Sequence, residues 1–200
     1  MKNRSDLVVL VDDNAEVSQA VSLLLKTVNL HTASFADPLA FLESDIERAG
    51  CILLDVRMPE MSGLEVFRKL RHELRIFVPV IFLTGHGEVG MAVRALRAGA
   101  FDFLEKPIDD QILVDSIFEA MTADAERRMQ SERQMAFRTL RDRLTPRELE
   151  IAYLLVEGET SRSIAERLGL SMRTIEGYRS RLMSKLEITS LAKLVDVLRD

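Results

Sequence analysis

Five short runs of apolar and other strand-forming residues lie in the first 125 positions, and longer amphipathic stretches separate them. The runs cover 7–11, 30–35, 51–54, 79–83 and 101–104. Apolar residues recur at helical spacing over 14–28, 37–46, 63–74, 88–97 and 109–125. Short strands that alternate with helices are typical of a parallel sheet built by right-handed crossovers. We therefore predict an α/β domain with a five-stranded, doubly wound parallel sheet covered on both faces.

The segment 119–143 predicts a helical linker. It contains no Gly or Pro and is rich in Arg, Glu, Gln, Met and Ala. This composition favours continuation of the preceding helix. Met121, Ala125 and Met129 continue a four-residue apolar spacing. That spacing fits either a seam for a partner helix or a solvated spacer.

The remaining residues carry only helix signals. Thr145-Pro146-Arg147-Glu148 combines a capping box with proline at the first helical position. One helix ends at Gly169, and Ser171 caps the next. Two helices joined by such a short turn predict a helix-turn-helix within an all-α, four-helix domain. The predicted organisation is a first domain over 1–122, a helical linker over 123–143 and a helix-turn-helix domain over 144–200.

The net charge of −5 hides an asymmetry between the two halves. Residues 1–125 carry 12 Lys+Arg against 20 Asp+Glu, whereas residues 126–200 carry 15 against 12. An acidic front and a basic rear favour different partners, although the rear excess alone does not establish nucleic-acid binding. No apolar run approaches the ~18 residues of a membrane span, and the single cysteine, Cys51, lies inside an apolar run. We expect a cytoplasmic protein with no membrane partner and no disulfide.

Functional side chains follow four of the five apolar runs. They are Asp12, Asp13, Asp55, Thr84 and Lys106. In an open α/β sheet such groups gather outside the carboxyl ends of the strands. Clustered carboxylates repel one another unless a hard divalent cation such as Mg²⁺ neutralises them. An aspartate beside a cation and an ammonium group is suited to accept a phosphoryl group as an acyl phosphate.

The order and spacing of these residues resemble the signature of two-component receiver domains over about residues 5–122, with Pro107 after Lys106. The resemblance implies a flavodoxin-like fold in which Asp55 accepts phosphate from a histidine kinase. It also implies that Mg²⁺ is held by Asp12, Asp13, Asp55 and the backbone carbonyl of Arg57.

The same resemblance implies a switch. Thr84 and Lys106 would sense the phosphoryl group, and Phe103 would be the aromatic residue that swings inward with Thr84. Phe103 alternates with Phe101, so on its own it fits a core residue equally well.

The helix after Ser171 presents two different faces at 100° per residue. Ile175, Leu182 and Leu186 share the apolar side. The opposite side gathers small and basic residues, namely Arg173, Gly177, Ser180, Arg181 and Ser184, with Glu176 on the flank. Such a face suits insertion into a major groove, with arginines and Lys185 on phosphates and Glu176, Ser180 and Arg181 near base edges. An ordinary basic solvent-exposed face has the same charges.

The rear motifs resemble the LuxR-type helix-turn-helix of FixJ/NarL-type response regulators over about residues 140–200. The resemblance is carried by Leu144 to Glu148, Gly158, Ile164-Ala165, Thr174-Ile175-Glu176 and Lys185-Leu186. The DNA contacts it implies are Ser161, Arg162, Arg173, Thr174, Glu176, Gly177, Ser180, Arg181 and Lys185.

This sequence departs from that family pattern at several positions. Ser161-Arg162 stands where Asn-Lys is frequent, and Gly177 stands where an aliphatic residue is frequent. Gly177 lacks a side chain that would touch bases, so operator preference does not transfer from relatives. The last helix, Leu191 to Arg199, is the family's dimerisation element, although its apolar residues fit a domain core equally well.

Together the halves predict a response regulator transcription factor that is phosphorylated on Asp55, forms a homodimer and binds promoter DNA. RNA polymerase is a further partner implied by the family. We do not expect an enzyme, beyond the receiver's own phosphoryl uptake and loss. Three alternatives remain: a phosphorylation-independent regulator with a silent receiver, a protein-interaction module, and a haloacid-dehalogenase-type enzyme. The last would need an acid where Arg57 stands.

Overall fold

The computed structural model describes residues 6–85 and 89–198. The chain divides into two compact units, residues 1–126 and residues 127–200, called here the N-terminal unit and the C-terminal unit. Among the described residues, no helix combines the length and the apolar character needed to cross a membrane.

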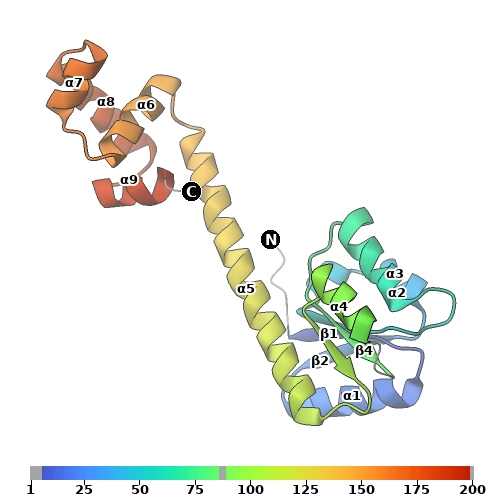
Figure 1. Cartoon of the computed structure of the whole chain (residues 1–200). Helices are drawn as coiled ribbons and strands as arrows, with labels where there is room; N and C mark the ends of the chain where they lie inside the picture. The colour runs from blue at the N-terminus through green and yellow to red at the C-terminus, as the bar shows by residue number, and fades with distance from the viewer. Residues whose placement is uncertain (1–5, 86–88, 199–200) are drawn as a thin grey trace. The chain divides into compact units, whose positions relative to one another are not determined.

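The N-terminal unit alternates strands and helices as the apolar pattern predicts (Figure 1). Its strands are β1 (Leu7–Val11), β2 (His31–Phe35), β3 (Cys51–Asp55), β4 (Val80–Thr84) and β5 (Asp102–Glu105). Its helices are α1 (Ala15–Thr27), α2 (Pro38–Leu42), η1 (Ile46–Arg48), α3 (Gly63–Arg68), η2 (Lys69–Glu73), α4 (Val89–Arg97) and the first part of α5 (Asp110–Arg141). The sheet has the order β2-β1-β3-β4-β5, and every neighbouring pair is parallel. The predicted α/β class and sheet are confirmed.

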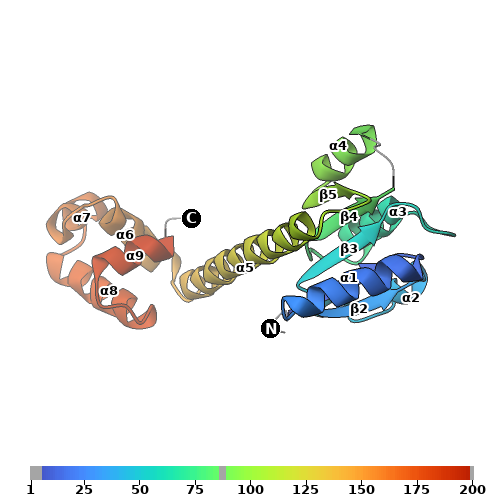
Figure 2. The same cartoon turned by 90° about the horizontal axis from the view of Figure 1, so that it is seen from below.

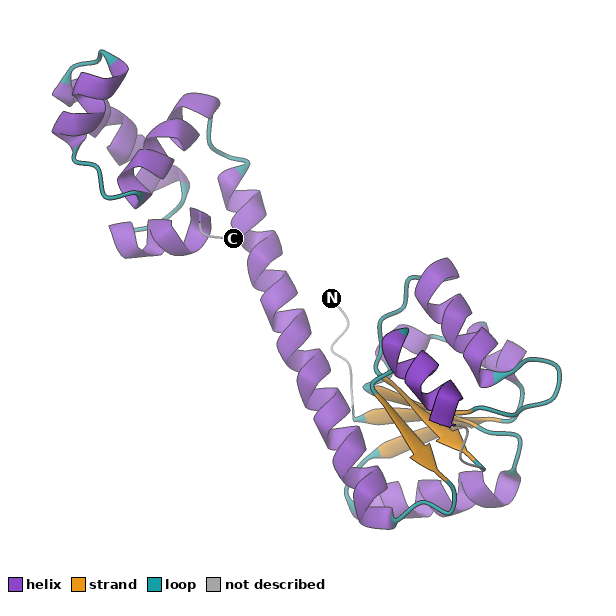
Figure 3. Ribbon diagram, viewed as in Figure 1, coloured by secondary structure: helices purple, strands orange, loops and turns teal. Residues whose placement is uncertain are grey.

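Each face of the sheet has its own core, because successive strand residues point to opposite sides. Val8 and Leu10 of β1 join the core that α1 and α5 cover. Val9 and Val11 join the core under α2, α3 and α4. Figure 3 shows the strands between these two layers of helices. Helices on both faces leave the carboxyl ends of the strands as the edge where polar groups can gather.

Two predicted helices differ from the pattern. The stretch 37–46 was expected to be one helix, but α2 ends at Leu42 and is followed by the short 3-10 turn η1. Both the N–H and the hydroxyl of Ser44 donate to the Phe41 carbonyl, which closes the helix end. The stretch 63–74 is helical, but its second half, η2, is a π-helix.

The C-terminal unit packs four helices around one core: α6 (Pro146–Val156), α7 (Ser161–Leu168), α8 (Met172–Lys185) and α9 (Leu191–Leu198), as Figure 2 shows. Thr145 and Glu148 form the predicted capping box. Gly169 ends α7 with φ of 65°, a left-handed conformation that favours glycine. Ser171 caps α8 through its hydroxyl. The predicted helix-turn-helix is confirmed as α7, a short turn and α8.

Helix α5 continues without a break from the N-terminal unit into the C-terminal unit. Leu113 and Ile117 are buried in the N-terminal core, and Phe137 and Leu140 pack against the C-terminal core. The absence of Gly and Pro over 119–143 explains why the helix is not interrupted.

Candidate phosphorylation site and nucleic-acid interface

Lys106 links two carboxylates at the carboxyl edge of the sheet. Its ammonium nitrogen lies 2.5 Å from Oδ2 of Asp12 and 2.7 Å from Oδ1 of Asp55. Burial alone would lower the pKa of Lys106, but the hydrogen bonds and negative charges of both carboxylates together outweigh burial and raise it. The backbone N–H of Lys106 also donates to the Thr84 carbonyl at 2.6 Å, which ties β5 to β4 beside the site.

Asp55 is fixed from two sides and is largely buried. Its Oδ2 accepts a hydrogen bond of 2.7 Å from the Arg57 backbone N–H, and its Oδ1 faces Lys106. Burial raises the pKa of Asp55, and the hydrogen bond and charge of Lys106 oppose that rise. Gly63 approaches the Asp55 backbone so closely that a Cβ there would lie 2.1 Å from the Asp55 carbonyl oxygen. The local chain therefore requires glycine at 63 for steric reasons.

The two acidic residues after β1 lie in different environments. Asp12 is 2% exposed and accepts a hydrogen bond from the Asn14 N–H, whereas Asp13 is exposed. The described residues contain no group of three or more His, Cys, Asp or Glu side chains arranged to hold a metal ion. Carboxylate oxygens are nevertheless the donors that Mg²⁺ prefers, and Asp12 and Asp55 already share one cationic group. The donor chemistry of the site therefore fits Mg²⁺.

Thr84 and Phe103 lie on neighbouring strands. Thr84 is buried at the end of β4, and Phe103 of β5 is half-buried. The Phe103 ring packs against Phe82, with ring centroids 6.1 Å apart. Phe103 is thus partly a core residue, in a position that is not fully enclosed.

The exposed face of α8 carries most of the residues expected to contact DNA. Ile175 and Leu182 are buried in the C-terminal core, as the periodicity predicts. Exposed residues on the other side are Arg173, Thr174, Glu176, Ser180 and Arg181. Gly177 is half-buried, and a Cβ built on it would meet no atom within 4 Å.

Lys185, expected to contact phosphate, donates to Glu148. Its ammonium lies 2.6 Å from the Glu148 carboxylate, which is 3% exposed. Glu148 also accepts from the backbone N–H and the hydroxyl of Thr145. The hydrogen bond from Lys185 lowers the pKa of Glu148, and burial opposes this. A contact 37 residues apart joins α8 to the start of α6, and local sequence patterns carry no signal for it.

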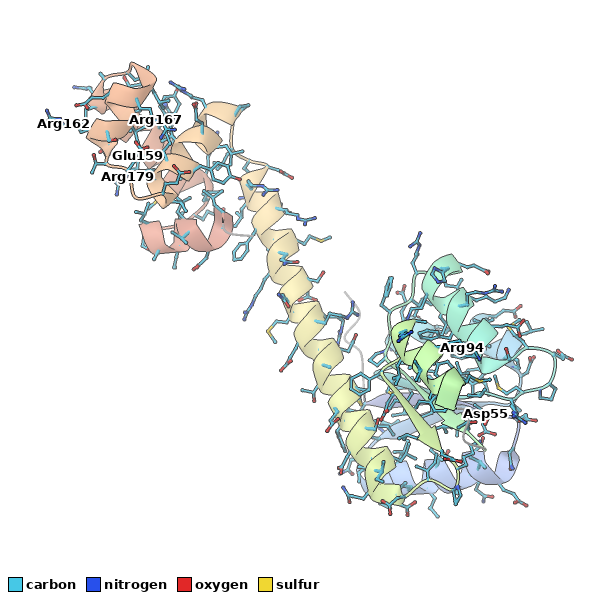
Figure 4. All side chains as sticks on the ribbon, in the orientation of Figure 1. Asp55, Arg94, Glu159, Arg162, Arg167 and Arg179 are labelled. Carbon is cyan, nitrogen blue, oxygen red and sulfur yellow. The ribbon has the colours of Figure 1, made fainter. Side chains whose placement is uncertain are left out.

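Other residues around α7 and α8 also have defined partners. The Arg181 guanidinium stacks 4.7 Å from the centre of the Tyr178 ring. Arg162 pairs with Glu166 on the exposed surface of α7, and Arg167 pairs with Glu159 (Figure 4). The Ser161 hydroxyl oxygen is buried and has no hydrogen-bond partner among residues 6–85 and 89–198. In α9, Leu194 and Leu198 are buried in the core, whereas Leu191 is 37% exposed.

Comparison with known families agrees with both units. Residues 8–118 match the family described as the response regulator receiver domain. Residues 142–198 match the luxR family of bacterial regulatory proteins. The chain belongs to the response regulators. It is a transcription regulator whose C-terminal unit is a LuxR-type DNA-binding domain.

Several full-length relatives share this response regulator's organisation. The response regulator protein TodT of Pseudomonas putida is 35% identical over 199 residues, covering 98% of this chain and 87% of TodT. The C4-dicarboxylate transport transcriptional regulatory protein DctR of Rhodobacter capsulatus is 40% identical over 189 residues, covering 92% and 95% of the two chains.

Two solved structures span both units of the response regulator. StyR matches with a TM-score of 0.83 and 36% identity, covering 96% of this chain and 97% of StyR. Full-length FixJ from B. japonicum matches with a TM-score of 0.57 and 32% identity, covering 98% and 96%.

Proposed function

We propose that this response regulator is phosphorylated on Asp55 by a histidine kinase in the cytoplasm. The observation that carries the proposal is Lys106, whose ammonium bridges Asp12 and Asp55 at the carboxyl edge of the sheet. A carboxylate held between an ammonium and a backbone N–H is oriented before the phosphoryl donor arrives, so alignment requires little further ordering.

In the proposed step, one carboxylate oxygen of Asp55 bonds to the phosphorus of a phosphohistidine. The phosphorus–nitrogen bond breaks, and the imidazole leaves with the electron pair. Mg²⁺, held by Asp12, Asp13, Asp55 and the Arg57 carbonyl, would supply neutralising charge for the phosphoryl oxygens. Lys106 would exchange its contact with Asp55 for one with the phosphoryl group.

The proposed switch couples this chemistry to dimerisation. Thr84 would turn its hydroxyl towards the new phosphoryl oxygens, and Phe103 would move into the space nearby. The half-buried state of Phe103 supports this role, because the ring is not fully enclosed. Phosphorylation would thereby favour a second receiver conformation that forms a homodimer.

The dimer would bind promoter DNA through α8 and act with RNA polymerase. Exposed Arg173, Thr174, Glu176, Ser180 and Arg181 support this, as does exposed Arg162 at the start of α7. Ser161, also proposed as a contact, would have to expose its hydroxyl. Lys185 contributes to the proposed interface mainly by joining α8 to Glu148. Two effector domains paired by dimerisation would gain affinity through their effective concentration.

The receiver chemistry is tested by incubating the full-length protein with acetyl phosphate and Mg²⁺ and measuring its intact mass. We expect one phosphoryl adduct on the wild type and none on Asp55→Asn. Wild-type protein without an adduct, while a partner kinase also fails to label it, would contradict the proposal and favour the silent receiver.

The DNA interface is tested by titrating a labelled mixed-sequence duplex at several salt concentrations. Arg173→Ala should weaken binding and reduce the slope of log K against log salt by about 1, because one phosphate contact is lost. Arg143→Ala, which removes an exposed charge from the segment before α6, is the matched control. Equal slopes for both variants would place the interface elsewhere.

A further inference from the structure

A hollow of about 490 Å³ lies between the α3–η2 segment and α4 of the N-terminal unit. Its apolar lining comes from Leu64, Phe67, Ala95 and Ala98. Its charged lining comes from Arg68, Arg71 and Arg94, the last labelled on α4 in Figure 4, and His72 adds a polar side chain. Among the described residues, the lining includes no aspartate or glutamate. The hollow has the size of a small-molecule pocket and is distinct from both the phosphorylation site and the α8 surface.

The π-helix η2 forms one wall of this hollow. The Leu74 N–H donates to the Lys69 carbonyl, five residues back, so the helix is locally widened. Short π-helical turns are rare and occur frequently at functional sites. This turn carries both Arg71 and His72.

Arg71 is held in a fixed position at the hollow. Its guanidinium donates to the carbonyls of Ile76 and Val78 at 2.6 and 3.0 Å. The same group lies 4.6 Å from the centre of the Phe67 ring and 5.7 Å from that of Phe77. A planar cation fixed in this way loses little freedom when a flat ligand contacts it.

The positive charge of the hollow stands out in an acidic unit. The first 125 residues carry 20 acidic against 12 basic side chains, and three of those twelve line this hollow. Arg94 forms no hydrogen bond or ion pair with any residue of the described part of the chain. The acidic residue beside Arg68 is Glu65, whose carboxylate is already bound to Ser62 in a capping box. An anion is therefore the charge type this hollow favours.

We propose that the hollow binds a small organic anion with a flat apolar body, such as an aromatic carboxylate. The apolar body would lie on Leu64 and Ala98, beside the fixed guanidinium of Arg71. The carboxylate would accept hydrogen bonds from Arg94 and Arg68, whose planar forks match its geometry. Because α4 follows β4 in the chain, the ligand binds the helix that comes directly after the strand ending in Thr84.

The test uses isotope-labelled full-length protein titrated with naphthoate and followed by amide chemical shifts. We expect saturable shifts confined to 64–72 and 94–98. Naphthalenemethanol, which has the same ring without the charge, should bind at least about tenfold more weakly. Inorganic phosphate tests whether the charge alone is sufficient, and phosphate shifting the same amides with equal affinity would overturn the proposal that an apolar body is recognised.

Three variants separate charge, shape and folding. Arg94→Ala should weaken naphthoate binding about tenfold or more, and Ala98→Leu should block it by filling the hollow. Arg97→Ala removes an exposed charge from the same helix outside the hollow and should bind like the wild type. Unchanged binding in Arg94→Ala, or equal loss in Arg97→Ala, would overturn the proposal. The titration requires no phosphorylation, so its failure leaves the proposed Asp55 chemistry unaffected.

Discussion

Each unit contains a carboxylate bonded to a lysine, and the two pairs behave in opposite ways. In the N-terminal unit, Lys106 lies 2.7 Å from Asp55, and in the C-terminal unit Lys185 lies 2.6 Å from Glu148. Burial dominates at Asp55 and raises its pKa, whereas the lysine hydrogen bond dominates at Glu148 and lowers its pKa. The comparison teaches that the balance between burial and the hydrogen bonds that a carboxylate accepts decides the direction of its pKa shift.

The two carboxylates also differ in how the hydrogen bonds around them are shared. Lys106 divides its hydrogen bonds between Asp55 and Asp12, and the Asp12 charge further raises the pKa of Asp55. Glu148 instead receives donors from Lys185 and from both the N–H and the hydroxyl of Thr145. Asp55 is therefore the less neutralised carboxylate and is available for chemistry, whereas Glu148 has a structural role that connects α6 to α8.

Moving the Asp55 backbone would break the first pair without removing either partner. Gly63→Ala places a Cβ against the Asp55 carbonyl, so we expect the N-terminal unit to lose about 3 kcal/mol of stability and the phosphoryl adduct to fall sharply. Unfolding is followed by labelling of Cys51, the only cysteine, which is fully buried in this unit. Gly90→Ala on α4 has free space around its Cβ and is the control. Equal labelling rates for the two variants would contradict the steric argument.

Removing the carboxylate charge of Glu148 should have the next largest effect on stability. Glu148→Gln leaves Lys185 without a carboxylate, so we expect about 2 kcal/mol less stability in the C-terminal unit. Tyrosine fluorescence reports this unit selectively, because both tyrosines of the chain, Tyr153 and Tyr178, lie in it and there is no tryptophan. Glu150→Gln removes an exposed pair with Arg147 and should cost at most about 1 kcal/mol. A loss for Glu150→Gln as large as for Glu148→Gln would show that burial of the pair is unimportant.

Replacing Asp55 by a neutral residue should change the stability of the N-terminal unit in the opposite direction, and by a smaller amount. Because burial disfavours its ionised form, Asp55→Asn should raise the unfolding midpoint reported by Cys51 labelling. The tyrosine signal of the C-terminal unit serves as the internal reference. A lower midpoint would mean that Asp55 stabilises the fold through Lys106 more than burial penalises it.

The smallest effects are opposite pH dependences. Because the pKa of Asp55 is raised in the folded protein, the contribution of Asp55 to stability is fully present at pH values below its ordinary pKa of 3.8. This contribution is lost as the pH rises through the pKa that Asp55 has in the folded protein. Because the pKa of Glu148 is lowered in the folded protein, the contribution of Glu148 to stability is fully present at pH values above its ordinary pKa of 4.5. This contribution is lost as the pH falls through the pKa that Glu148 has in the folded protein. Relative to Asp55→Asn and Glu148→Gln, the wild-type units should therefore show slopes of opposite sign in Cys51 labelling and tyrosine fluorescence. If the stabilities of both units changed in the same direction with pH, the proposed difference between the Asp55 and Glu148 pairs would be contradicted.

The sequence predicts the fold well because the relevant signals are local. Five apolar runs give the strands, and Thr145, Gly169 and Ser171 mark helix ends through their own hydrogen bonds or backbone conformation. Strand ends also place Asp55 and Lys106 at one edge of the sheet. The π-helix η2 escapes prediction, because Lys69 to Glu73 are ordinary helix formers and the shifted hydrogen bond depends on tertiary packing.

The sites are less predictable wherever a partner lies far along the chain. The Lys106 bond to Asp12 spans 94 residues, and the Lys185 bond to Glu148 spans 37. Periodicity assigns Lys185 correctly to α8 but gives no information on the buried acid that it meets. Exposed positions such as Arg173 follow from periodicity alone, because no distant partner in the described part of the chain determines them.

Gly63 and Gly177 give this regulator two very different degrees of evolutionary freedom. Any side chain at 63 collides with the Asp55 backbone, whereas a Cβ at 177 would meet no atom within 4 Å. A single codon change at 177 could add a group to the proposed DNA-facing side of α8 without disturbing the core. A lineage carrying this protein could thus redirect it to new promoters while the chemistry that receives the signal stays unchanged.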